Sequence, residues 1–349
     1  MWMKRVLGIF ILCFLFTIPW ILLVSIQPED YPYDYEQLSE NERLVIRFSH
    51  VVGEDTPKGM AARKFAELVK ERSNGYIEVQ VFSNGNLYKD GEEMNALSRG
   101  DIQLIAPAIS KLTEYVPEIS IFDLPYAFHS LDEVHEFVET KAGQTLVERL
   151  KAHNLYAISL WDSGFKQMSN RIRPIHHYDD IKRLTMRIMP SDILEKQFSS
   201  LGAFPKKYDF NAVYNELQKG SVDGQENTLT NITSKNIYSL QDYLTISNHG
   251  YLGYFVLFNL DFWNSLDEDV KQLLTETFQE VQEWEWKLTN QLNKETLQKI
   301  ENCGCIELHY LSQEDMLEWE KRFEPLYNYY KQNYGDEFIN ALPKYQTDT

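Results

Sequence analysis

The stretch LVIRFSHVVGEDTPKGMAARKFAELVKERSNGYIEVQVF, residues 44–82, decides the fold of this chain. Its mostly apolar start, residues 44–49, predicts a buried strand. Thr56 then offers an N-cap, and the proline after it suits the first position of a helix. Apolar residues recur at helical spacing until Asn74-Gly75, a typical helix end. Apolar and polar residues then alternate over 77–81, as in a half-exposed strand, so the stretch predicts a β-α-β unit.

The same alternation of strands and helices continues along the chain. The elements expected next are a helix at 92–97, strands at 102–106, 155–160 and 185–189, a helix capped by Ser191, and a helix at 211–219. Such alternation favours mainly parallel sheets with helices on their faces. The fold class that we expect is therefore α/β.

A long, polar-rich helical stretch runs from residue 267 to residue 301. At 1.5 Å per residue it would be about 50 Å long, which is longer than one lobe of a protein this size requires. We expect it to run across two lobes and to brace them. The alternative is a pair of helices with a break near Thr289-Asn290.

The overall composition limits the classes of function. The 349 residues are enough for two lobes with separate cores. The formal net charge is -18, and no basic stripe interrupts it, which argues against nucleic acid as a partner. A small anionic ligand stays possible, because a few cations in a low-dielectric cleft outweigh distant surface charge.

The N-terminus has the character of a membrane segment. Lys4 and Arg5 precede an uncharged run, residues 6–26, which is about one bilayer long. The flanking charges place the N-terminus inside and the remainder outside. We therefore expect a signal-anchor or transmembrane segment at 1–28 and an acidic linker at 29–43, which would tether the protein to the extracytoplasmic face of the plasma membrane. A cleavable signal peptide is the alternative, and the protein would then be periplasmic or secreted.

Sequence motifs of enzymes are missing from this chain. It has no GxGxxG, Walker A, GxSxG or HExxH motif, so we expect no catalysis, no cofactor and no metal. Cys303 and Cys305 are too close in sequence for an ordinary disulfide, and we expect them to be unpaired residues beside a short strand.

Several short blocks carry a resemblance to a known family. In chain order they are Phe48-Ser49-His50-Val51-Val52 with Thr56-Pro57-Lys58-Gly59, Asn86-Leu87-Tyr88-Lys89-Asp90, Phe122-Asp123-Leu124-Pro125-Tyr126, Gly164-Phe165-Lys166, Met186-Arg187-Ile188, Val222-Asp223-Gly224-Gln225-Glu226-Asn227 and Asn248-His249-Gly250-Tyr251-Leu252-Gly253-Tyr254. From about Ile46 onward the chain resembles the DctP-type solute-binding proteins of tripartite ATP-independent periplasmic (TRAP) transporters, in particular the C4-dicarboxylate-binding subfamily.

The resemblance implies a fold with two α/β lobes, a long helix spanning both, and a ligand cleft between them. The boundaries it suggests are 44–164 plus 253–292 for the first lobe, and 165–252 plus 293–349 for the second. The function it implies is capture of a C4-dicarboxylate of the malate, succinate or fumarate type by closure of the cleft. The partners would be TRAP membrane permease subunits. The alternative is a co-receptor that reports its ligand to a membrane sensor kinase.

The resemblance also implies which residues bind the ligand. Arg187 lies in the block where these receptors have the arginine that pairs with a ligand carboxylate, and the planar fork of arginine suits that role. Without the resemblance, a surface or ion-paired arginine would be the simpler interpretation. Asn227 lies where the family has a ligand-contacting amide, which can both donate and accept hydrogen bonds.

A dicarboxylate needs further cations, and four more residues are candidates for the ligand site. Lys166 and Lys111 fall where sialic-acid-binding members of the family have basic contacts, although this chain is one residue shorter just after Lys166. His50 and Lys58 border the mouth of the same cleft, beside the start of a helix whose N–H groups attract anions. The aromatic residues that we expect to wall the pocket, or else to pack in the core, are Phe210, Tyr251 and Tyr254.

Overall fold

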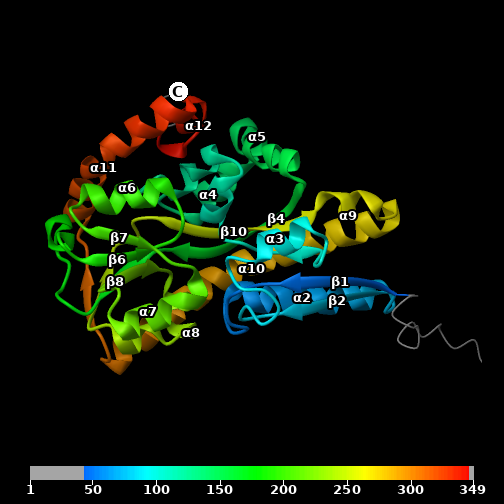
Figure 1. Cartoon of the computed structure of the whole chain (residues 1–349), viewed down its shortest axis with the longest axis horizontal. Helices are drawn as coiled ribbons and strands as arrows, with labels where there is room; N and C mark the ends of the chain where they lie inside the picture. The colour runs from blue at the N-terminus through cyan, green and yellow to red at the C-terminus, as the bar shows by residue number, and fades with distance from the viewer. Residues whose placement is uncertain (1–42, 346–349) are drawn as a thin grey trace, which may run out of the picture.

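Two β-sheets with helices around them make up the computed structural model, which describes residues 43–345 (Figure 1). The predicted membrane segment and nearly all of the acidic linker lie outside the described residues. Within residues 43–345, no helix has both the length and the apolar composition that crossing a bilayer requires.

The first sheet has the strand order β2-β1-β3-β10-β4. Its strands are β1 (Leu44–Ser49), β2 (Ile77–Phe82), β3 (Leu104–Ile105), β4 (Leu155–Phe165) and β10 (Tyr251–Asn259). β1 is parallel to β2 and β3, as the β-α-β pattern predicts, whereas β10 is antiparallel to β3 and β4. β3 is shorter than expected, and β4 extends beyond the expected end at residue 160.

The second sheet has the order β11-β9-β5-β8-β6-β7. Its strands are β5 (Gln167–Asn170), β6 (Thr185–Ile188), β7 (Phe204–Lys207), β8 (Gly224–Asn227), β9 (Tyr243–Ile246) and β11 (Glu307–Tyr310). β6 is parallel to both its neighbours, and β5 is antiparallel to both of its own. Both sheets are therefore mixed. The antiparallel pairs come from strands at the crossovers, because β4 leads directly into β5 and β9 leads into β10.

Helices cover the faces of both sheets. They are α2 (Pro57–Arg72), α3 (Glu93–Ser98), α4 (Leu131–Glu139), α5 (Lys141–Arg149), α6 (Asp192–Ser200), α7 (Val213–Lys219), α8 (Leu229–Ser234), α9 (Leu260–Ser265), α10 (Glu268–Cys303), α11 (Gln313–Tyr334) and α12 (Glu337–Asn340). The predicted caps are confirmed: the side chains of Thr56 and Ser191 accept hydrogen bonds from the first turns of α2 and α6. Figure 1 shows α6 and α7 on opposite sides of the second sheet.

Helix α10 is continuous over 36 residues, so the alternative of a break near Thr289-Asn290 is wrong. Near its start, Phe278 stacks on Phe65 of α2 with ring centroids 3.8 Å apart. Near its end, Ile300 packs in the same apolar cluster as Ile232 of α8. The helix therefore braces elements of both sheets, as the sequence predicts.

The polar residues of α10 have a structural role along the edge strand β4. Five of their side chains hydrogen-bond to its backbone: Gln282 to Leu160 N (2.8 Å), Trp286 to Leu160 O (3.0 Å), Glu285 to Asp162 N (2.9 Å), Thr289 to Asp162 O (3.4 Å) and Asn293 to Ser163 O (2.9 Å). An edge strand otherwise presents unpaired N–H and C=O groups. The polar residues that suggested a break in the helix are therefore the residues that hydrogen-bond to the backbone of this edge strand.

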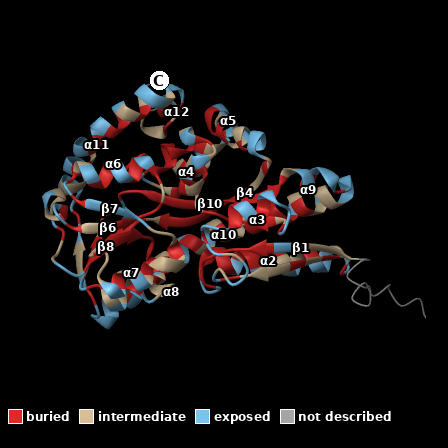
Figure 2. Cartoon of the chain, in the orientation of Figure 1, coloured by how far each residue is buried: buried red, intermediate tan, exposed pale blue. Residues whose placement is uncertain are grey.

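Buried residues form the inner faces of the helices and most of the strands (Figure 2). β10 is buried along its whole length, and so are β5 and β8 at the centre of the second sheet. A run without exposed positions is typical of strands covered on both faces. Polar side chains on these strands must therefore find partners inside the protein or in a cavity.

Cys303 and Cys305 form a disulfide, so the expectation of unpaired cysteines is wrong. Gly304 follows the end of α10 in the left-handed conformation (φ 58°) and turns the chain back on itself. The two Cα atoms are 5.2 Å apart, which is within the usual range for disulfides.

Removal of the Phe65–Phe278 stack tests the docking of α10. Because both rings are almost completely buried, Phe278→Ala should lower the free energy of unfolding by about 3–5 kcal/mol. Urea unfolding followed by circular dichroism measures it. The control is Leu317→Ala, at a side chain that is 54% exposed, where a change within about 0.5 kcal/mol is expected. Equal stabilities of the Phe278→Ala and wild-type proteins would contradict this packing.

Candidate functional site

A cavity lies where the carboxyl ends of β1, β6 and β8 approach the first turn of α2. Its lining includes Lys58, Asp90, Lys111, Arg187, Asn227 and Tyr254. The carboxyl ends of parallel strands are a frequent position for ligand sites in α/β proteins. The cavity is the place where most of the predicted ligand-binding residues meet.

Arg187 is a buried cation without a carboxylate partner. It lies on β6 between β7 and β8, in register with Gln225, and only 1% of its surface is exposed. Its Nε donates to Tyr208 O at 2.9 Å, and within residues 43–345 no carboxylate lies at ion-pair distance. Burial lowers the pKa of Arg187, but arginine stays protonated in proteins. The outer nitrogens of the guanidinium are therefore available to an anion in the cavity.

Lys58 is the second buried cation of this kind. It lies in the first turn of α2, where the positive end of the helix dipole disfavours a cation. Its Nζ donates to Ala106 O at 2.7 Å and lies 3.6 Å from the centroid of the Tyr254 ring, and no described carboxylate pairs with it. Burial lowers the pKa of Lys58 to about 8, so the lysine is mostly charged at neutral pH.

Lys111, in contrast, is already neutralised. It lies on the 3-10 helix η2 (Ile109–Glu114), and its Nζ is 2.7 Å from Asp209 Oδ1 and 3.1 Å from Asp90 Oδ1. Asp90 is buried as well. Lys111 lines the cavity as predicted, but two protein carboxylates compensate its charge.

Asn227 is the last residue of β8 and lies close to Arg187 in the neighbouring strand β6. Its Oδ1 accepts hydrogen bonds from Thr228 N and from Nδ2 of Asn231, both at 3.0 Å. Because a backbone N–H must find an oxygen, this contact fixes the orientation of the amide. The NH2 group of Asn227 has no acceptor within the described part of the chain and can donate to a ligand.

Lys166 does not line the cavity. Its Nζ pairs with Glu226 Oε1 at 2.8 Å, and Glu226 Oε2 is 2.7 Å from Nε2 of His249. Although burial raises the pKa of Glu226, Lys166 and His249 outweigh that effect and lower it to about 2. The charge of Lys166 is therefore compensated inside the protein.

His50 does not line the cavity either. It is completely buried, and burial together with the nearby Lys58 lowers its pKa to about 3, so the ring is neutral. Of the aromatic residues, Phe210 and Tyr254 line the cavity, whereas the hydroxyl of Tyr251 donates to Asp162 at 2.6 Å in the core.

Asp90 and Asn231 are lining residues that the sequence did not single out for a role. Asp90 stands at the end of one of the blocks quoted above, but an acidic residue is an unlikely choice for an anion site. Asn231 lies four residues after Asn227, at the start of α8, where its Nδ2 also donates to Tyr254 OH at 3.1 Å. The only sequence signal that could have identified Asn231 is its position one helical turn after Asn227.

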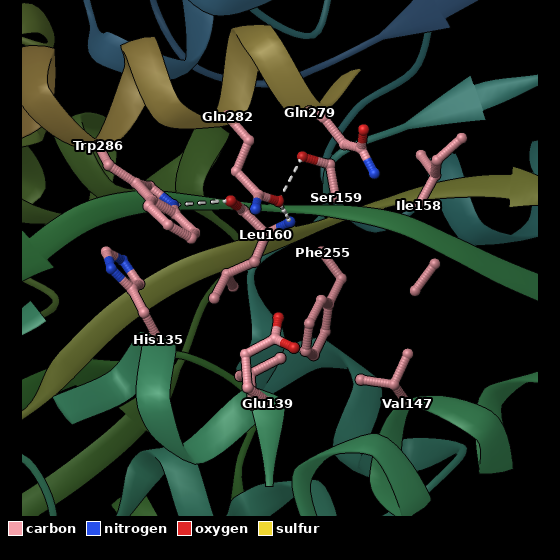
Figure 3. A pocket seen from close by; sticks show the side chains of 12 residues that line it. His135, Glu139, Val147, Ile158, Ser159, Leu160, Phe255, Gln279, Gln282 and Trp286 are labelled. Atoms are coloured by element: carbon pink, nitrogen blue, oxygen red, sulfur yellow. Dashed lines mark hydrogen bonds between the residues drawn. The ribbon is translucent and has the colours of Figure 1, made fainter. Parts of the chain in front are cut away.

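A second cavity, of about 240 Å³, lies between α4, β4 and α10 (Figure 3). His135 stacks on Trp286 at its wall, with ring centroids 3.5 Å apart. No lysine or arginine is among its lining residues, and Glu139 adds a negative charge. This cavity is therefore poorly suited to an anionic ligand. Within residues 43–345, no group of three or more His, Cys, Asp and Glu side chains is arranged to hold a metal.

Comparison with known proteins identifies the family of this chain. The family model described as bacterial extracellular solute-binding protein, family 7, matches residues 48–333. The chain belongs to this family. It is therefore an extracytoplasmic solute-binding protein, and nothing in the comparisons indicates catalysis.

Individual relatives of this solute-binding protein cover nearly its whole length. A C4-dicarboxylate-binding protein of Bacillus subtilis, DctB, is 43% identical over 317 residues, which is 91% of each chain. A TRAP periplasmic solute-binding protein of Shewanella oneidensis, solved with bound succinate, superposes with a TM-score of 0.84 at 35% identity, covering 86% of this chain and 98% of that one. A similar protein of Pseudomonas aeruginosa with bound L-malate gives 0.80 at 35% identity, covering 82% and 99%.

Because Lys166 has a carboxylate partner and Arg187 has none at ion-pair distance in residues 43–345, replacing them should change the stability by very different amounts. Lys166→Met should lower the free energy of unfolding by about 3–5 kcal/mol, because it removes the lysine that neutralises the buried Glu226 and leaves that carboxylate with only its contact to His249. Arg187→Met removes a buried charge that has no carboxylate at ion-pair distance within residues 43–345, so a change within about 1 kcal/mol is expected. Chemical denaturation of the two variants in ligand-free buffer makes the comparison. Equal and large losses would mean that Arg187 has a structural partner.

Proposed function

We propose that this solute-binding protein binds a C4-dicarboxylate and that one carboxylate of the ligand pairs with Arg187 while the other pairs with Lys58. The observation that carries the proposal is that one cavity has two buried cations for which the described residues, 43–345, provide no carboxylate partner. A buried charge without a partner is destabilising, and a dianion would compensate both. Lys111 and Lys166 are less suitable because each already has a carboxylate.

The two cations suit different parts of the ligand. The guanidinium of Arg187 can bind a carboxylate bidentately, and its Nε–Tyr208 hydrogen bond fixes the plane of the fork. The ammonium of Lys58 acts as a point charge against the face of Tyr254. The NH2 group of Asn227 adds a neutral donor. Together these groups favour short, doubly charged acids over neutral or singly charged solutes.

The names of the relatives support the same ligand class. The Bacillus subtilis relative is named for C4-dicarboxylate binding, and the two solved structures hold succinate and L-malate. We further propose that the protein delivers its ligand to TRAP membrane permease subunits and that its N-terminal segment anchors it to the outer face of the plasma membrane. The alternative role as a co-receptor of a sensor kinase finds no support in the comparisons.

A comparison of succinate with butyrate tests the pairing of two charges. The two acids have the same chain length, but butyrate leaves one buried cation without a partner, at a cost of about 1–3 kcal/mol or more. Succinate should therefore bind at least about tenfold more tightly in isothermal titration calorimetry. In Lys58→Met the preference should largely disappear, and in Arg187→Lys both acids should bind weakly. Equal affinities of the wild-type protein would refute the dicarboxylate assignment.

The affinity for succinate should fall as the pH rises above about 8. Burial lowers the pKa of Lys58 to about 8, and a bound carboxylate favours its charged form, so binding above this pH takes up a proton. The affinity should then fall by up to about tenfold per pH unit. Burial also raises the pKa of Glu93 to about 8, and its ionisation adds a negative charge that acts in the same direction.

Isothermal titration calorimetry at several pH values between about 7 and about 9.5 measures this dependence, because a group with a pKa near 8 titrates in this range. The control is Lys58→Arg. Because its guanidinium stays protonated, the affinity of this variant for succinate should depend much less on pH. The weak dependence that remains would come from Glu93. An affinity of the wild-type protein that is constant over this range would exclude Lys58 from the site.

A further inference from the structure

The two sides of the cavity are also in direct contact with each other, through residues other than those proposed to bind the ligand. The segment 208–211, between β7 and α7, meets the segment 84–91, between β2 and α3. The contacts between them are Phe210 N to Asp90 Oδ2 (2.7 Å), Asp90 N to Asn211 Oδ1 (3.0 Å) and Asn211 Nδ2 to Asn84 O (3.3 Å). Lys111 of η2 adds a contact from its Nζ to Asp209 Oδ1 (2.7 Å). One segment belongs to the first sheet and the other to the second, so these bonds bridge the two sheets across the cavity.

The close approach of the two segments depends on glycine. A Cβ atom on Gly91 would lie 2.7 Å from Asp209 Oδ2, and one on Gly85 would lie 2.7 Å from Asn211 Nδ2. Gly85 also has a φ of 69°, which disfavours any larger residue. A side chain at either position would displace the Asp209 or Asn211 side chain from this contact. The sequence of segment 84–91 is therefore fitted to this contact.

The same segment reaches into the binding site. Tyr208 O accepts the hydrogen bond from Nε of Arg187, and the Phe210 side chain lines the cavity. Residues 208 and 210 thus contact the binding site, whereas residues 209 and 211 hydrogen-bond to residues on the side of the first sheet. A shift of the segment would move the acceptor that orients the guanidinium.

The charges at the contact favour a structural role for Lys111. Its ammonium lies between Asp90, which is buried, and Asp209, of which 44% of the side-chain surface is exposed. Lys111 and Asp90 come from the side of the first sheet, and Asp209 comes from the second. Because its charge is already balanced, Lys111 strengthens the bridge without competing for the anion.

We propose that residues 208–211 clamp the cleft shut and that Asp209 and Asn211 are positioning residues that set the dissociation rate of the solute. The proposal rests on the proposed binding of a dicarboxylate in this cavity. Opening of the cleft has to break the bonds to Asp90, Asn84 and Lys111 before the ligand leaves. Entry of the ligand does not require these bonds, so the association rate should not depend on them.

The test measures the two rate constants separately. Stopped-flow measurements of intrinsic fluorescence, with the full-length protein and increasing succinate, give association from the slope and dissociation from the intercept. Asp209→Asn removes the negative charge that pairs with Lys111, and Asn211→Ala removes the hydrogen bonds to Asp90 N and Asn84 O. Each variant should raise the dissociation rate about tenfold and change the association rate by less than about twofold. Gly91→Ala should act in the same direction because its methyl group displaces Asp209.

Two controls separate the clamp from general effects of charge. Asp209→Glu keeps the carboxylate and should restore part of the slow dissociation. Asp179→Asn removes another exposed aspartate, which pairs with Lys182 in its own segment, and should leave both rate constants unchanged. Wild-type dissociation rates in both Asp209→Asn and Asn211→Ala would overturn the clamp while leaving the dicarboxylate site intact.

Small-angle scattering gives a readout that does not depend on succinate. The double variant Asp209→Asn/Asn211→Ala should have a larger radius of gyration than the wild-type protein in the same buffer, because loss of the bridge favours open conformations. Equal radii would also overturn the clamp. If the wild-type protein binds no dicarboxylate, the proposed function fails, and this scattering comparison alone decides the clamp.

Discussion

A strand at the edge of a sheet leaves a row of backbone N–H and C=O groups without partners. The architecture of this protein depends on the side chains of α10 that hydrogen-bond to these groups in the edge strand β4. Gln282, Glu285, Trp286 and Asn293 hydrogen-bond to the backbone of this strand at Leu160, Asp162 and Ser163. Because β4 leads directly into β5, the strand that α10 covers is also the one that carries the chain into the second sheet. One long helix therefore stabilises the first sheet and fixes the crossover beside it.

Compensation of buried charge explains how the cavity differs from the rest of the interior. Lys166, which is buried, and Lys111, which is partly buried, have carboxylates at 2.8 Å and 2.7 Å, and they act as parts of the protein framework. Arg187 and Lys58 are buried as deeply as Lys166, and in the described part of the chain they contact carbonyl oxygens and an aromatic ring but no carboxylate. Such destabilising groups persist in proteins mainly where function requires them.

Local chemistry accounts for the elements that could be predicted from the sequence. The strand at residues 44–49, the cap at Thr56 and the helix after Ser191 depend on neighbours in the chain, and they are confirmed within a residue or two. The sequence did not settle whether α10 is continuous. Polar residues near Thr289 could also mark a break between two helices, and only the structure shows that they face β4. The mixed order of the sheets has the same cause, since antiparallel pairing of β10 with β4 joins residues about ninety positions apart.

The candidate site divides in the same way. The sequence by itself determined which residue types are present in recognisable blocks, and it named Arg187, Asn227, Lys111 and Lys58, which line one cavity. Only the tertiary structure decided which cations are compensated and that Cys303 and Cys305 are joined. Lys166 meets Glu226 from 60 residues away and Lys111 meets Asp209 from 98 residues away. The charge available to a ligand depends on such long-range pairs and on burial, because an ion pair forms only where folding brings its two partners together.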